Sequence, residues 1–221
     1  MTTDGPFRPR SLPAISWLGL VLALLGMLII RQAVGFLWPN LPLPAVILRE
    51  ALFWASGAGL ILLIRKGERL PLSSIGLGTR GLIKSILWGL VIFVACIVVG
   101  GLLAHLLNYG HGPASAAFDK LPLWMVTLVV LRAGVVEELF YRGYAIERLQ
   151  ALGLNRFVAA GIPLIIFGVG HWTGGAANIL IALALGAILA GFYLWHRDLV
   201  ANMIGHFLVD FVANVLPKFF S

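Results

Sequence analysis

Long apolar runs separated by short polar breaks dominate the sequence. Each run holds about 20 residues, which is enough for an α-helix to cross the hydrocarbon core of a bilayer. The breaks between the runs consist of glycine, proline or charged residues. The first run lacks a small-residue cleavage site, so we interpret it as a retained helix and not as a signal peptide. The pattern predicts seven transmembrane helices, at residues 14–38, 44–64, 82–107, 122–150, 157–172, 177–195 and 199–217.

The composition narrows the fold class to an all-α, polytopic membrane helical bundle. Hydrophobic residues make up 60% of the 221 residues and charged residues 11%, against about 25% charged residues in soluble domains. These values exclude a soluble globule, a disordered chain, a coiled coil and a disulfide scaffold. The apolar runs are also too long for the strands of a membrane β-barrel. The single cysteine, Cys96, lies in an apolar run and is interpreted as a small core residue.

The basic residues predict how the chain is oriented in the membrane. Ten of them flank the helices on one side and two, Lys120 and Lys218, on the other. Because basic loops stay in the cytoplasm, we expect a cytoplasmic N-terminus in a multi-pass protein of the cell membrane. The net charge of +7 forms no basic run, so the lipid bilayer is expected as a partner and nucleic acid is not. The ten are Arg8, Arg10, Arg65, Lys66, Arg69, Arg80, Lys84, Arg148, Arg156 and Arg197.

The polar residues divide the chain into two parts. Residues 1–121 would supply three helices with a cytoplasmic loop, and residues 122–221 a catalytic core of four helices. Ionisable residues inside a membrane are costly unless they are paired or hydrated, so each is a candidate site residue. Arg31 and Glu50 lie at similar depths in the first two helices, and we expect them to form a structural ion pair near Arg49. No role is assigned to Arg132.

The fourth predicted helix carries two adjacent glutamates, Glu137 and Glu138. Successive residues of a helix turn by about 100°, so the two carboxylates face different directions. Glu138 and Arg142 are four residues apart, in the order that favours an ion pair. Glu137 is thereby predicted to lack a local cation, which suits a general base or acid in a low-dielectric site.

Two later helices carry further polar side chains. Asn202, His206, Asp210 and Asn214 are spaced by four and form one stripe, which we expect to face the bundle interior or water. His171 lies 17 residues after Leu154, and Glu137 lies 17 residues before it. Equal offsets in antiparallel helices correspond to similar depths, so these groups are predicted to converge on one cavity.

A carboxylate and an imidazole facing one water can activate it for attack on a peptide carbonyl. Glu137 would take the proton, His171 would hold the water or relay the proton, and His206 with Asp210 would stabilise the oxyanion. A serine-nucleophile elbow and a His-Glu-x-x-His motif are both absent from the sequence. No cofactor is therefore expected, with one alternative: a divalent metal such as zinc held by Glu137, His171 and His206.

Three short motifs resemble those of the CPBP family of CAAX proteases and bacteriocin-processing enzymes, also called the ABI family. They are Glu137-Glu138-x-x-x-Arg142, Phe167-x-x-x-His171 and His206-x-x-x-Asp210, in this order, on successive predicted helices. The resemblance implies an intramembrane endopeptidase of the type II CAAX prenyl protease kind. It implies catalytic roles for Glu137, His171, His206 and the residue at position 210, and supporting roles for Glu138 and Arg142. The eukaryotic enzymes have asparagine where this chain has Asp210, and eight spans instead of seven.

The function that these residues predict is hydrolysis of a peptide bond in a membrane-associated peptide or protein, either a CAAX-like substrate or a prepeptide. An alternative of another class is a non-catalytic immunity or scaffolding protein of the same family. A third interpretation is a proton-coupled transporter that uses the same groups as a relay. The sequence contains no inverted repeat to favour the transporter.

Overall fold

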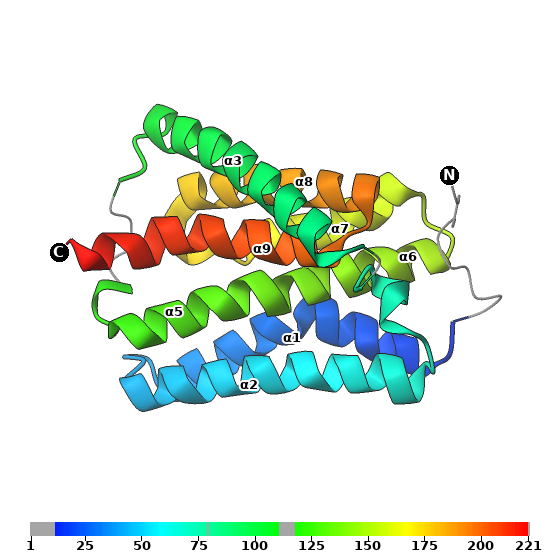
Figure 1. Ribbon diagram of the computed structural model, residues 1–221. Helices are drawn as coiled ribbons and strands as arrows, with labels where there is room; N and C mark the ends of the chain where they lie inside the picture. The colour runs from blue at the N-terminus through cyan, green and yellow to red at the C-terminus, as the bar shows by residue number, and fades with distance from the viewer. Residues whose placement is uncertain (1–11, 79, 111–117, 221) are drawn as a thin grey trace.

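The structure is a computed structural model that describes residues 12–78, 80–110 and 118–220. Arg8, Arg10 and the break at residues 111–113 lie outside the described residues. The described residues form an elongated bundle of helices (Figure 1).

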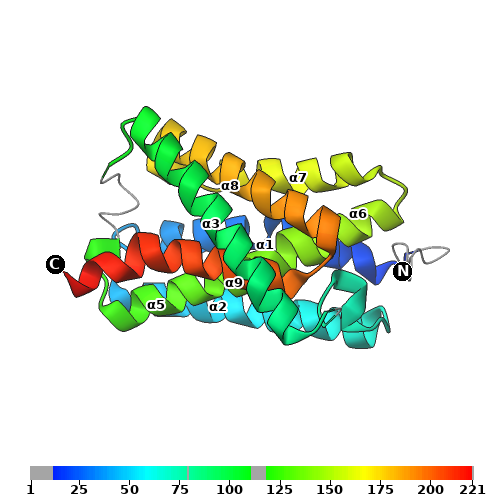
Figure 2. The same cartoon turned by 45° about the horizontal axis from the view of Figure 1, so that its top comes forward.

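The N-terminal part contributes three long helices. Helix α1 (Ile15–Leu37) lies beside α2 (Leu43–Leu62), which continues as a π-helical turn, η1 (Leu63–Gly67). Pro42 has an extended backbone and starts α2, because proline needs no hydrogen-bond acceptor for its nitrogen at a helix start. A loop containing the 3₁₀ turn η2 (Leu72–Ile75) leads to α3 (Leu82–Leu106). Figures 1 and 2 show α3 crossing α9 obliquely.

The C-terminal part begins with one unbroken helix made of α5 (Leu123–Arg132), the π-helical segment η3 (Ala133–Ile146) and α6 (Glu147–Ala151). Helices α7 (Arg156–Val169) and α8 (Gly175–His196) follow, joined through the 3₁₀ turn η4 (Trp172–Gly174). The last helix consists of α9 (Leu199–Asp210), the π-helical turn η5 (Phe211–Val215) and the 3₁₀ turn η6 (Leu216–Phe219). Asn155 and Asp198 cap α7 and α9 by accepting hydrogen bonds from backbone N–H groups.

Helices occupy all seven predicted ranges, so the prediction of a polytopic helical bundle is confirmed. Five helices of the described residues are long and apolar enough to cross a membrane, and the protein is a multi-pass membrane protein. Helix α7 has 14 residues and spans about 21 Å, less than the hydrocarbon core of about 30 Å. The turn that follows it, with His171, therefore lies within the depth of the bundle.

The segment η3 lies at the centre of the bundle, where it contacts α1, α2, α7 and α9. Its large side chains, among them Phe140 and Tyr144, are fully buried. Gly89 of α3 and Gly205 of α9 allow a close crossing, because a Cβ atom at Gly205 would lie 3.1 Å from the carbonyl oxygen of Gly89. Cys96 is buried nearby, as predicted. The division at residue 121 stays a prediction, although α3 packs extensively along α9.

Basic loop residues predicted to share one side of the membrane are joined at one end of the bundle. Arg80 donates a hydrogen bond to the carbonyl oxygen of His196, and Arg197 donates one to that of Ser74. Arg148 forms an ion pair with Glu68 at 2.7 Å. At the opposite end, Lys218 donates to the carbonyl oxygen of Leu121 at 2.9 Å. Arg80, Arg148 and Arg197 therefore share one end of the bundle, and the cytoplasmic orientation of that end stays a prediction.

Candidate active site

Glu138 is the centre of a buried polar network. Its carboxylate accepts hydrogen bonds from Arg142 at 2.7 Å, from Nδ1 of His206 at 2.7 Å and from Asn202 at 3.2 Å. Asn202 also donates to the carbonyl oxygen of Leu189 at 2.8 Å. The side chain of Glu138 is fully buried. The predicted Glu138–Arg142 pair is present, and the network joins η3 to α9.

The ring of Phe167 connects this network to the second histidine. The guanidinium of Arg142 lies over the ring, 4.6 Å from its centroid. The ring centroid of His171 lies 4.7 Å from that of Phe167, and the ring centroid of His206 lies 6.2 Å from it. Residues from η3, from α7 and its end, and from α9 thus meet at one place.

The hydrogen bond of His171 determines which of its nitrogens is available. Nδ1 lies 2.8 Å from the carbonyl oxygen of Phe167. A carbonyl oxygen only accepts hydrogen bonds, so Nδ1 carries the proton that is donated. In the neutral ring Nε2 then has the lone pair, and it has no hydrogen-bond partner among the described residues. This tautomer suits a residue that accepts a hydrogen bond from water.

Glu137 is not left without a cation, so that prediction is wrong. Its carboxylate accepts a hydrogen bond from Arg132, which also donates to Glu50 at 2.9 Å. In η3 the backbone hydrogen bonds run from residue i to i+5, which brings residues five positions apart to one side. An α-helical spacing argument therefore missed Arg132. Glu137 keeps 13% of its side chain exposed, whereas Glu138 has none.

The predicted Arg31–Glu50 pair is also wrong. Glu50 pairs with Arg132 and, at 3.2 Å, with Arg49. Arg31 instead donates to the carbonyl oxygen of Gly170 at 2.8 Å and to Oγ1 of Thr173 at 2.5 Å. Although the two side chains are at similar depths, Arg31 faces the end of α7 and Glu50 faces α5. Arg31 therefore holds both sides of the turn that carries His171, a role that the sequence did not indicate.

The polar side chains of the last helix are buried in the bundle near the start of the helix and are partly exposed further along it. Asn202 and His206 are buried, and the side chain of Asp210 is 30% exposed. Oδ2 of Asp210 lies 3.5 Å from Nε2 of His206. Asn214 donates to the backbone oxygen of Asp210. The carboxylate of Asp210 therefore lies beside the ring nitrogen of His206 that Glu138 does not occupy.

The structure brings together most of the predicted site residues by direct contact. Glu138, Arg142, His206 and Asp210 form one chain of polar contacts, and His171 joins it through Phe167. Among the described residues, no hydrogen bond or ion pair links Glu137 to either histidine.

Residues 119–212 match the family model for Rce1-like type II CAAX prenyl endopeptidases. The match confirms the resemblance that the three motifs indicated, and it contains all of them. The match supports a CAAX-type membrane protease as the class of activity. Neither a search of curated proteins nor a search of solved structures returns a match.

The Rce1-like segment contains the residues named as an alternative metal site. The part of the chain that the structure describes has no cluster of three or more His, Cys, Asp or Glu side chains at metal-binding spacing. Nδ1 of His171 and Nδ1 of His206 are each hydrogen-bonded to a protein oxygen, so in both rings only Nε2 could bind an ion. The divalent metal at Glu137, His171 and His206 therefore stays the alternative prediction.

Proposed function

We propose that the protein is an intramembrane endopeptidase that hydrolyses a peptide bond of a membrane-associated peptide or protein. The observation that carries the proposal is the meeting of the three motifs around Glu138 and Phe167, in the interior of a multi-pass membrane bundle. A buried network of this kind is costly in a membrane and is typical of a functional site. The Rce1-like match supports the same class of reaction.

In the proposed mechanism Glu137 and His171 activate one water molecule. The lone pair of Nε2 of His171 orients the water, and the carboxylate of Glu137 takes its proton as the oxygen attacks the peptide carbonyl. The proton is then delivered to the leaving nitrogen, so the products are a free carboxylate and a free amine. Arg132 positions Glu137, and its second partner, Glu50, holds the guanidinium in place.

His206 and Asp210 would face the oxygen that becomes negatively charged. Nδ1 of His206 is occupied by Glu138, which leaves Nε2 to donate a hydrogen bond to the oxyanion. An ionised Asp210 accepts hydrogen bonds only, so in this proposal it orients the ring of His206. Glu138 and Arg142 support the ring of His206 and do not touch the substrate.

The proposed substrate is a chain already held at the cell membrane, either with a CAAX-like end or as a prepeptide. Comparative terminal proteomics of membrane fractions tests this, with cells that express the wild-type protein or Glu137→Ala. We expect a peptide terminus that is present with the wild type and lost in the variant. Asp119→Asn removes an exposed carboxylate and serves as the control.

Purified protein in liposomes then tests the residue roles with a peptide that contains the identified cleavage site. Glu137→Ala and His171→Ala are each expected to lower kcat by about 100-fold or more. Turnover that survives both changes would refute the proposed mechanism. A phenotype that persists in Glu137→Gln, without any lost terminus, would favour the immunity or scaffolding function instead.

A further inference from the structure

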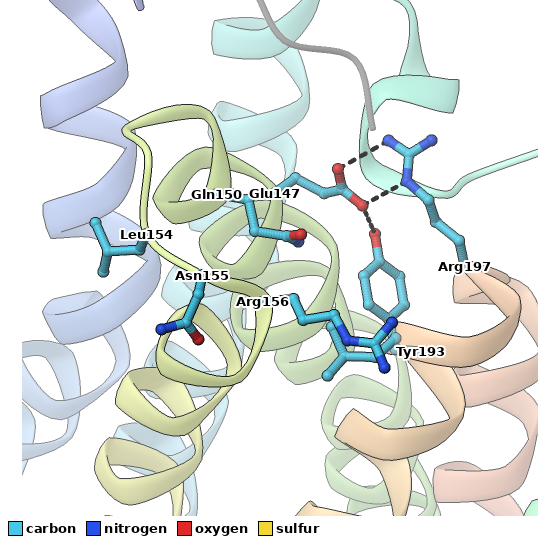
Figure 3. Close-up of a pocket in the computed structure, with 8 residues that line it drawn as sticks. Glu147, Gln150, Leu154, Asn155, Arg156, Tyr193 and Arg197 are labelled. Carbon is cyan, nitrogen blue, oxygen red and sulfur yellow. Dashed lines mark hydrogen bonds and ion pairs between the residues drawn. The ribbon is translucent and has the colours of Figure 1, made fainter. Parts of the chain in front are cut away.

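A polar pocket lies at the end of the bundle that carries the basic loops, away from the catalytic network. It has a volume of about 410 Å³ and lies between α6, the start of α7 and the end of α8. Figure 3 shows its lining side chains. They are Glu147, Gln150, Leu154, Asn155, Arg156, Tyr193, Leu194 and Arg197.

The one carboxylate in this lining is already neutralised. Glu147 accepts hydrogen bonds from Arg197 at 2.6 and 2.8 Å, and from the hydroxyl of Tyr193 at 2.9 Å. Glu147 is buried and held on one wall by these bonds, as Figure 3 shows. It therefore contributes no net negative charge that would repel an anion from the pocket.

Arg156 supplies a positive charge that nothing in the described chain neutralises. It is exposed, and its guanidinium packs only on the ring of Phe157, 4.8 Å from the centroid. No carboxylate of the described residues forms an ion pair with it. Asn155 uses its side-chain oxygen to cap α7, so its amide group is left to donate a hydrogen bond. The guanidinium of Arg156 is therefore a donor that suits an anion.

The place of the pocket indicates where that anion comes from. The turn before α7 lies at the predicted cytoplasmic surface, where anionic lipids concentrate and basic pockets between helices bind their headgroups. Leu194 adds apolar surface beside the guanidinium of Arg156. We propose that this pocket binds the phosphate group of an anionic phospholipid, with Arg156 as its main cation. A soluble phosphate offers the same chemistry, and the experiment separates the two sources.

Native mass spectrometry of the full-length protein in detergent tests the site by titration with phosphatidylglycerol, phosphatidylcholine and inorganic phosphate. We expect tighter binding of phosphatidylglycerol than of phosphatidylcholine. Arg156→Gln should weaken the phosphatidylglycerol affinity by about fivefold, because one basic residue at the surface contributes about that factor. Lys84→Gln removes an exposed charge outside the pocket lining and should leave the affinity unchanged.

A second variant keeps the charge and fills the space. Gln150→Trp, at a side chain that points into the pocket in Figure 3, should reduce phosphatidylglycerol binding while Arg156 stays in place, and thermal unfolding of each variant verifies that the protein is folded. If the protein binds inorganic phosphate and Arg156→Gln abolishes that binding, the pocket is an anion site for a soluble ligand. That result would overturn the proposal that a lipid supplies the anion. Equal affinities for the two lipids, or equal losses in Arg156→Gln and Lys84→Gln, would overturn the site.

Discussion

The two adjacent glutamates provide the sharpest test of the site, because the same substitution should have opposite effects at the two positions. Glu138→Gln removes the charge that faces Arg142 and His206, both of which are buried. Loss of one member of a buried ion pair costs about 3–5 kcal/mol, since the other charge is left uncompensated. Glutamine keeps an oxygen that accepts from Arg142, so we expect the lower value, about 3 kcal/mol of unfolding free energy.

Glu137→Gln should leave stability almost intact and remove activity. Its carboxylate is partly exposed, and Arg132 keeps a second partner in Glu50 at 2.9 Å. We expect a loss of about 1 kcal/mol or less in unfolding free energy. Turnover should fall by about 100-fold or more, because the proton acceptor is missing.

Thermal unfolding in detergent, followed by turnover measured well below each midpoint, separates the two effects. For a chain of this length about 3 kcal/mol corresponds to a decrease in Tm of about 6–12 °C in Glu138→Gln. An unchanged Tm in Glu138→Gln would refute the buried network as a source of stability. A full kcat in a folded Glu137→Gln protein would refute the proposed role of Glu137.

Three further predictions concern the rest of the site. Arg31→Gln should lower kcat more than it changes KM, because Arg31 holds the turn around His171. Arg31→Lys should restore part of the activity. Equal kcat values in both variants and the wild type would contradict this role. Asp210→Leu should lower kcat by about 100-fold. Asp210→Asn keeps a polar group beside His206 and should lower kcat far less. Identical losses of kcat in the two variants would contradict the proposed role of Asp210 in orienting His206. Dialysis against EDTA should leave turnover unchanged if Glu137 and His171 activate the water without a metal, and a loss that zinc restores would support the metal alternative.

The helices and the general placement of the site could be predicted from the sequence because both depend on local pattern. A bilayer requires about 20 apolar residues for each crossing, so the runs and their breaks define the helices directly. The ion pair of Glu138 and Arg142 also follows from local spacing. The depth of His171 followed approximately from counting residues, since helices rise by a constant amount.

The partners of the remaining charged residues depended on the tertiary structure. Depth along a helix does not determine the direction that a side chain faces, so Arg31 and Glu50 lie at similar depths and still face different neighbours. The π-helical winding of η3 brought Arg132 to Glu137, and no local propensity in the sequence indicated it. The sequence by itself thus determined which segments form helices and which polar residues they carry. Only the packing of the helices decided which of those residues meet, because rotation of each helix about its axis is determined by its contacts with the others.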